Sequence, residues 1–274
     1  MHWIINAALS REPAYAALIA AVERQGREHT IVHKPPFAPY LTSGIAGDVD
    51  AEGHERPITL DIEGPIFVAG TTSMEHVSAA HGWSPGYITA PSQSECMKHW
   101  GGHMLNHGAV FGRLDKIAPP FAETFFLRPD EDIKNFAGRT MEPSGFEDWR
   151  RSILDVEGWT TMPAETMIMA APLRTIWSEY RCIVVEGRYV TGSRYRTAGR
   201  VEYFPDVAPM VVDYVNARIA EWNPRPALAV DVAHTPDGLR IIETNSVSSA
   251  GFYAIDMEKF VAAISGLGRR NSNG

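Results

Sequence analysis

The sequence is poor in cysteine and has no long apolar run. Its 274 residues include only two cysteines, Cys96 and Cys182, which lie far apart and in no metal-binding or redox spacing. We therefore expect a protein of the reducing cytoplasm. No apolar run approaches the length that spans a bilayer, and the first residues lack the cationic segment of a signal peptide. The sequence thus predicts neither a membrane span nor a membrane partner.

An excess of basic charge is also lacking. The formal net charge is −8, which argues against broad binding to nucleic acid or to an anionic membrane, although local basic patches remain possible. Hydrophobic residues make up 45% and charged residues 21% of the chain, as in an ordinary globular protein. The length suffices for a large core divided among two or three subdomains.

Several common catalytic motifs do not occur. There is no GxxxxGKS/T loop and no GxGxxG between a predicted strand and helix, so P-loop and Rossmann readings have no support. Nothing supplies a Ser–His–Asp or Cys–His motif, so we expect no covalent enzyme intermediate.

The first part of the chain has the pattern of a small parallel α/β unit. An apolar strand at residues 3–6 precedes a helical pattern at 12–25 and a second strand at 29–32. We expect an N-terminal α/β lobe over residues 1–118 that contributes to substrate binding, with a boundary at Pro119-Pro120. A second region would span 119–264 and a flexible tail 265–274. The predicted fold class is α/β.

Residues 227–253 read as two apolar strands, joined by Pro236-Asp237-Gly238, and a loop of small residues. If Thr235 faces Leu239, then Asp231 faces Glu243, and Asn245 lies on the same face of the sheet. Facing carboxylates repel unless a cation or a proton separates them, and hard oxygen ligands suit Mg²⁺. The pattern alone equally allows these three residues to lie along a half-exposed strand without binding a ligand.

A second hairpin joins residues 177–185 to 188–196 through the turn pair Glu186-Gly187. Its predicted register places Val185 opposite Arg188, Arg181 opposite Gly192, and Glu179 opposite Arg194. One face would then carry Glu179, Arg181, Arg194 and Arg196. Three guanidiniums and one carboxylate suit an anion site, and cross-strand ion pairs on an exposed face are the alternative.

Other basic residues allow two readings each. Arg128 ends the predicted strand at 121–129, and Lys134 follows in the next turn. The two residues could together bind phosphate, or they could be two unrelated surface cations. His99, His103 and His107 recur every four residues, which would align them on a helix as zinc ligands, or on a helix that faces the substrate or simply the solvent. Gly101-Gly102 weakens that helix, which favours the surface reading.

Taken in order, four segments resemble the ATP-grasp superfamily of ATP-dependent ligases: FFLRP, ETMIMAAP, SEYRCIVVEGRYVTGSRYR and AVDVAHTPDGLRIIETNSVSSAGFY. The resemblance covers about residues 121–264. It implies an ATP-grasp fold with an N-terminal α/β pre-grasp lobe. The superfamily usually has lysine at the position of Arg128, and this sequence looks like the clade with arginine there and a lysine downstream, here Lys134.

The resemblance also implies site residues. Asp231, Glu243 and Asn245 would hold magnesium ions. Nucleotide contacts would come from Arg128, Lys134, Glu179 and an adenine-binding hinge of Met167, Ile168, Met169 and Ala170. Arg181, Arg194 and Arg196 would bind phosphates or an acyl-phosphate. Ser246, Ser248, Ser249 and Gly251 would position the substrate.

The implied reaction uses ATP to phosphorylate a carboxylate, which an amine or a thiol then attacks, releasing phosphate and leaving ADP. Expected partners are Mg-ATP, a small or peptide carboxylate such as an amino acid, and an amine. An ATP-dependent kinase on the same fold and a non-enzymatic nucleotide- or partner-binding protein are the alternatives. A homodimer remains open.

Overall fold

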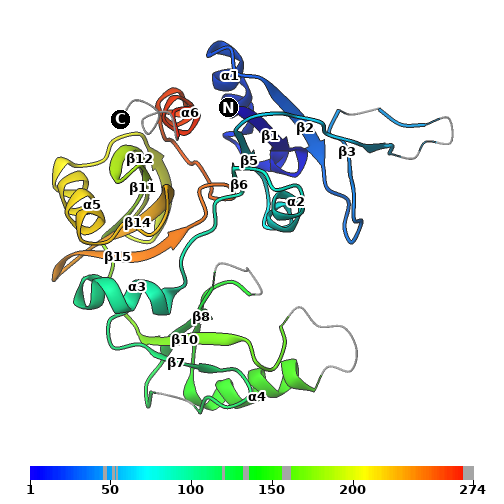
Figure 1. The fold of residues 1–274 in the computed structure, drawn as a ribbon. Coiled ribbons are helices and arrows are strands. Elements are labelled where there is room, and N and C mark those ends of the chain that lie inside the picture. The colour runs from blue at the N-terminus through cyan, green and yellow to red at the C-terminus, as the bar shows by residue number, and fades with distance from the viewer. Residues whose placement is uncertain are drawn as a thin grey trace.

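The computed structural model describes residues 1–45, 48–50, 53, 55–118, 121–131, 136–155 and 162–267 (Figure 1). In these ranges the chain forms three sheets, which follow one another along the sequence. The mixed α/β class predicted from the sequence is confirmed. None of the helices in the described ranges is long and apolar enough to cross a membrane.

The N-terminal sheet has the strand order β4-β3-β2-β1-β5-β6. Its elements are β1 (His2–Asn6), η1 (Ala7–Arg11), α1 (Tyr15–Arg24), β2 (His29–His33), β3 (Leu41–Ser43), β4 (Pro57–Ile58), β5 (Ile66–Ala69), α2 (Met74–Ala80) and β6 (Pro85–Gly86). β1 pairs in parallel with both β2 and β5, so the predicted parallel unit is confirmed. The helix begins at Tyr15 instead of residue 12, because a 3-10 turn capped by the Asn6 side chain precedes it.

The middle sheet is antiparallel, with the order β7-β10-β8-β9. Its elements are β7 (Val110–Arg113), β8 (Phe125–Pro129), β9 (Arg139–Met141), α4 (Pro143–Leu154) and β10 (Met167–Pro172). Phe146 of α4 packs with Phe125, Leu127 and Ile168 in the core of this lobe. β7 precedes the predicted boundary at residues 118/119 but already belongs to this sheet. Pro119-Pro120 and residues 268–274 of the predicted tail lie outside the described residues, and the division into regions stays a prediction.

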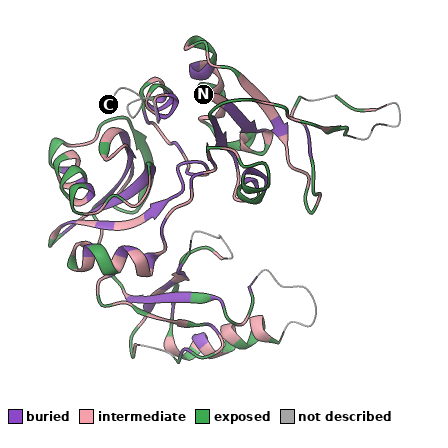
Figure 2. Ribbon diagram, in the orientation of Figure 1, coloured by how far each residue is buried: buried purple, intermediate pink, exposed green. Residues whose placement is uncertain are grey.

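The C-terminal sheet has the order β13-β12-β11-β14-β15. Its elements are α3 (Gln93–Trp100), η2 (Gly101–His103), β11 (Ser178–Val185), β12 (Arg188–Thr197), β13 (Arg200–Phe204), α5 (Pro209–Glu221), β14 (Ala227–Thr235), β15 (Gly238–Asn245) and α6 (Met257–Ser265). Its central strands are almost entirely buried (Figure 2). α3 and α5 contribute to the core on one face of this sheet.

α6 connects the C-terminal lobe to the N-terminal one. Its Phe260 and Val261 share one core with Ile183 and Ala229 of the C-terminal sheet and with Trp3 of β1. The Trp3 indole also donates a hydrogen bond to the Ser265 hydroxyl, at 3.1 Å. The outer lobes are therefore parts of one packed body, beside which the middle sheet lies (Figure 1).

The predicted register of the β14–β15 hairpin is wrong at its turn and right at its far end. Thr235 pairs with Gly238 instead of Leu239, so the turn has two residues. A β-bulge then adds Ile242 to β15, and beyond it Asp231 pairs with Glu243 as predicted.

The predicted register of the β11–β12 hairpin is wrong beyond its turn. Val185 does face Arg188, but Arg181 pairs with Ser193 and Glu179 with Arg196. The register shifts twice, and the second shift makes Tyr195 the extra residue on β12. A bulge re-aims the side chains around it, which no turn-based pairing rule anticipates.

The packing of α6 yields a first testable prediction. Phe260 is fully buried against Trp3 and Phe67, so Phe260→Ala should lower the free energy of unfolding by about 3–5 kcal/mol. Urea denaturation measures this. Lys259→Ala, on the solvent side of the same helix, is the control and should change it by less than about 0.5 kcal/mol. Equal effects of the two variants would contradict the packing described here.

Candidate active site

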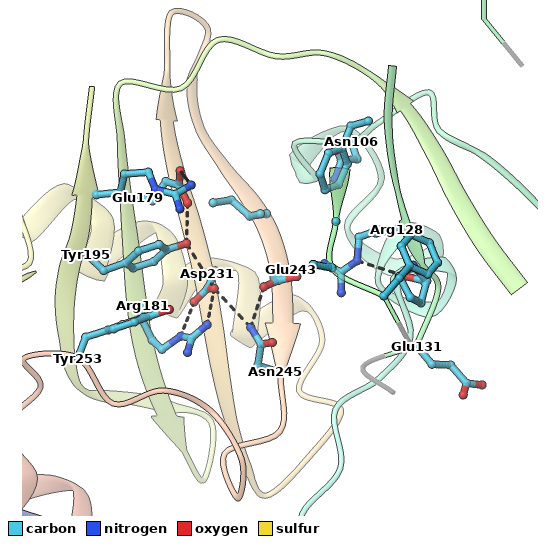
Figure 3. A pocket seen from close by; sticks show the side chains of 17 residues that line it. Asn106, Arg128, Glu131, Glu179, Arg181, Tyr195, Asp231, Glu243, Asn245 and Tyr253 are labelled. Carbon is cyan, nitrogen blue, oxygen red and sulfur yellow. Dashed lines mark hydrogen bonds and ion pairs between the residues drawn. The ribbon is translucent and has the colours of Figure 1, made fainter. Parts of the chain in front are cut away.

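A cavity of about 370 Å³ lies between the middle and C-terminal sheets (Figure 3). β8 contributes Arg128 from one side, and β11, β12, β14 and β15 contribute the polar side chains on the other. The bulged residues Tyr195 and Ile242 line it. The residues that line it from these strands are Phe126, Arg128, Pro129, Glu179, Arg181, Tyr195, Arg196, Asp231, Ile242, Glu243 and Asn245.

Asp231, Glu243 and Asn245 converge as the sequence predicts. The Asn245 amide nitrogen donates to Asp231 Oδ2 at 3.3 Å and to Glu243 Oε1 at 3.1 Å. It therefore occupies the position between two carboxylates where a cation would reduce their repulsion. Asp231 is 1% exposed, so water does little of this screening.

Each of the two carboxylates also has an arginine partner. Arg181 binds Asp231 in a bidentate pair, with Nε to Oδ1 at 2.8 Å and Nη2 to Oδ2 at 2.7 Å. Burial lowers the pKa of Arg181, but the Asp231 charge outweighs it, and the net pKa is raised. Arg128 forms an ion pair with Glu243 from the opposite wall of the cavity. Arg128 thus links the two sheets across the site.

Glu179 binds two neighbours on β12. It accepts from Arg196 Nη1 at 2.9 Å and from the Tyr195 hydroxyl at 2.8 Å. Burial, together with the charges of Asp231 and Glu179, raises the pKa of Tyr195 and keeps its hydroxyl protonated as a donor. The prediction omitted Tyr195, because only the bulge directs its side chain into the cavity.

Arg194, predicted to share this face, does not line the cavity. It pairs with Tyr180, whose side chain belongs to the core on the α5 side of the sheet. Its guanidinium lies over the Phe204 ring, 4.6 Å from the centroid. The structure therefore brings together Glu179, Arg181 and Arg196 but not Arg194.

The predicted adenine hinge at residues 167–170 falls in the centre of the middle sheet. β10 is hydrogen-bonded to β7 on one side and to β8 on the other over most of this range. Ile168 and Ala170 point into the core beside α4. The backbone of β10 is thus already paired in the sheet. Ladder pairing ends at Pro172, and residues 173–177 cross from the middle sheet to the C-terminal one.

The small-residue loop after β15 ties the lobes together. Ser246 donates to the carbonyl of Ile88 at 2.7 Å, and Ser248 accepts from the Ile88 N–H at 3.0 Å. The Ser248 carbonyl accepts from Gly70 N. Gly251 instead faces the site, where its carbonyl accepts from Arg181 Nη1 at 2.9 Å. Ser249 is half-buried.

The histidine pattern does not form a ligand set. α3 ends at Trp100, so the three histidines are not aligned on one helix. His99 stacks on Trp222, His103 contacts Arg218, and His107 bonds the Met104 carbonyl. Lys134 lies outside the described residues.

The residues of the cavity fit a magnesium ion. Two carboxylates and one amide provide the hard oxygen donors that Mg²⁺ prefers. They meet at one place, where the Asn245 amide lies between the carboxylates of Asp231 and Glu243. Across the ranges that the structure describes, no three His, Cys, Asp or Glu side chains converge, so a magnesium ion here would need the Asn245 oxygen as its third protein ligand.

Solved structures with this fold share little sequence identity with the chain. D-cycloserine synthetase DcsG aligns with a TM-score of 0.61 at 12% identity, over 96% of this chain and 98% of its own. A RimK domain ATP-grasp protein from Sphaerobacter thermophilus aligns at 0.63 and 12%, over 96% and 100%. Phosphoribosylamine–glycine ligase from Thermotoga maritima aligns at 0.63 and 13%, over 97% and 75%. These likenesses show an ATP-grasp fold.

The family assignment comes from the sequence. A family model described as an ATP-grasp domain, family 3 of its clade, matches residues 59–264. The match covers most of the chain, which therefore belongs to this ATP-grasp family. No curated protein sequence matches the chain. The predicted superfamily is confirmed, and the pattern of Arg128 with Lys134 stays a prediction.

The two ion pairs predict different costs for their removal. Asp231→Ala leaves the buried Arg181 charge without its partner and should lower the free energy of unfolding by about 3–5 kcal/mol. Glu243→Gln should cost less than half of that, because the Arg128–Glu243 pair is more exposed and glutamine can still accept a hydrogen bond. Urea denaturation of both variants checks this, and an equal loss would contradict the assigned burial of the pairs.

Proposed function

We propose that this chain is an ADP-forming ligase that activates a carboxylate as an acyl-phosphate and joins it to an amine or a thiol. The observation that carries the proposal is the cavity of an ATP-grasp chain that is lined by Arg128, Arg181 and Arg196 together with Asp231, Glu243 and Asn245. Arginines beside a set of hard oxygen ligands suit a nucleotide triphosphate with its metal.

Each group in the cavity has a role in this proposal. Asp231, Glu243 and Asn245 hold Mg²⁺, which when bound offsets the negative charge of the phosphates. Arg128, with Lys134, binds the nucleotide phosphates, and Arg181 and Arg196 stabilise the charge that develops on the transferred phosphoryl group. Glu179 orients Arg196 by the 2.9 Å ion pair.

The adenine would meet the crossing segment at residues 173–176. This stretch begins where the ladder pairing of β10 ends, so its backbone groups are not part of the sheet. It also joins the two sheets that enclose the cavity. A planar base bound at this segment would take the place of the hinge at residues 167–170 expected from the sequence.

The second substrate would enter beside the nucleotide. A neighbouring cavity of about 320 Å³ shares Glu131 with the first and is lined by Thr72 and Glu75 at the start of α2 and by Ser246. The N-terminal lobe thus reaches the reaction site, which supports a role in substrate binding.

Free thiols at Cys96 and Cys182 suit a reducing, ATP-rich cytoplasm.

The proposal predicts Mg²⁺-dependent ADP formation stimulated by one carboxylate and one amine together, in a screen of amino acids and short peptides. Glu243→Gln should reduce this turnover by roughly 100-fold with the fold intact, because it weakens the ligand set for the Mg²⁺ that offsets the phosphate charge. Glu258→Gln breaks a surface ion pair on α6 and is the matched control with wild-type turnover.

The products separate the outcomes. Free phosphate released only with both substrates supports the ligase. A stable phosphorylated product would instead identify a kinase, and unchanged turnover in Glu243→Gln would contradict the assigned site.

A further inference from the structure

Arg181 has two N–H groups available for a ligand. Its five N–H donors include Nε–H and one Nη2–H bound to Asp231, and one Nη1–H bound to the Gly251 carbonyl. One N–H on each terminal nitrogen has no partner among the described residues. Because Arg181 lines the cavity, these two groups are the ones that can meet a ligand there.

The central carbon of the same guanidinium lies over an aromatic ring. Arg181 Cζ is 4.8 Å from the centroid of Tyr253 and 5.9 Å from that of Tyr195. A cation–π contact uses the face of the guanidinium, whereas hydrogen bonds use its edge. Tyr253 therefore restrains the plane of Arg181 without occupying the N–H groups that point from its edge.

The Tyr253 ring also contacts two other tyrosine rings. It stacks on Tyr195 with centroids 4.7 Å apart and on Tyr203 of β13 at 5.1 Å. Its backbone has φ of 50°, a left-handed conformation that costs free energy in a residue with a side chain. A strained tyrosine kept at this position indicates that the ring has a use that a glycine, free of strain, could not provide.

We propose that Tyr253 is a positioning residue whose ring, held by stacking on Tyr195 and Tyr203, fixes the plane of Arg181 so that its two remaining N–H groups face the transferred phosphoryl group. The inference rests on the proposed function of the cavity. It adds a residue that makes no hydrogen bond to the phosphoryl group itself, and it gives β13 a part in the site through Tyr203.

The test compares binding of Mg-ADP alone with binding of Mg-ADP plus fluoroaluminate, a mimic of the phosphoryl group in transfer. Isothermal titration calorimetry measures both for the full chain. In the wild type we expect fluoroaluminate to tighten ADP binding by at least about tenfold. Tyr253→Gly should lose most of this tightening while binding Mg-ADP alone within about twofold of the wild type, because ADP lacks the group that Arg181 meets.

Two variants show whether the ring or the backbone matters. Glycine accepts positive φ, so Tyr253→Gly removes the ring without adding strain. Tyr253→Phe keeps the ring and should retain most of the tightening. If Tyr253→Gly does not fold, Tyr203→Ala removes only the outer ring and should cause a smaller loss in the same direction. Tyr40→Ala, an exposed tyrosine of the N-terminal lobe, is the control.

Each outcome decides between the claims. Full tightening in Tyr253→Gly, or in Tyr203→Ala where that variant replaces it, would overturn the role of Tyr253. A loss in Tyr253→Phe as large as in Tyr253→Gly would do so too, since the hydroxyl and not the ring would then matter. A wild type that binds Mg-ADP but gains nothing from fluoroaluminate would overturn this inference and leave nucleotide binding intact. A wild type that binds no Mg-ADP would overturn the proposed function itself.

Discussion

The buried ion pair between Arg181 and Asp231 organises the site. The two residues face each other across β11 and β14, and at 5% and 1% exposure neither charge is stable there without the other. Asp231 in turn receives the Asn245 amide, and Arg181 holds the Gly251 carbonyl and lies over Tyr253. The strand β15, the loop after it and the aromatic stack are thus positioned relative to one charge pair.

The same region joins the lobes. Ser246 and Ser248, directly after β15, bond to Ile88 and Gly70 of the N-terminal lobe, and α6 packs Phe260 against Trp3. On the other side, Arg128 reaches Glu243 from the middle sheet. The cavity therefore lies beside the contacts that join the three lobes. A ligand that contacts both Arg128 and Asp231 would connect the middle sheet with the C-terminal sheet.

Much of this could be predicted from the sequence, and the register errors have one physical origin. The alternation of side chains along the strands placed Asp231, Glu243 and Asn245 on one face. It also placed Arg181, the partner of Asp231, and Glu179, the partner of Arg196, on another strand of the same site. Counting alternate residues from a turn does not predict β-bulges. The bulge in β12 directs Tyr195 into the cavity and leaves Arg194 outside it. The bulge in β15 offsets the one-residue error in the predicted turn, so that Asp231 still pairs with Glu243. The hinge at 167–170, which the family resemblance implies, falls on a central strand that is paired on both edges, and its contact with adenine stays a prediction.

We propose that Asp231, Glu243 and Asn245 form the metal site of a nucleotide-binding cavity. An amide N–H cannot face a cation, so metal binding requires Asn245 to present its oxygen in place of the nitrogen that now bonds both carboxylates. A crystal structure of the chain with Mg²⁺ and ADP tests this most directly. We predict the metal between Asp231 and Glu243, with Asn245 Oδ1 directed at it and the ADP phosphates beside Arg128. A metal bound elsewhere, or an Asn245 nitrogen still bonded to both carboxylates, would contradict the account.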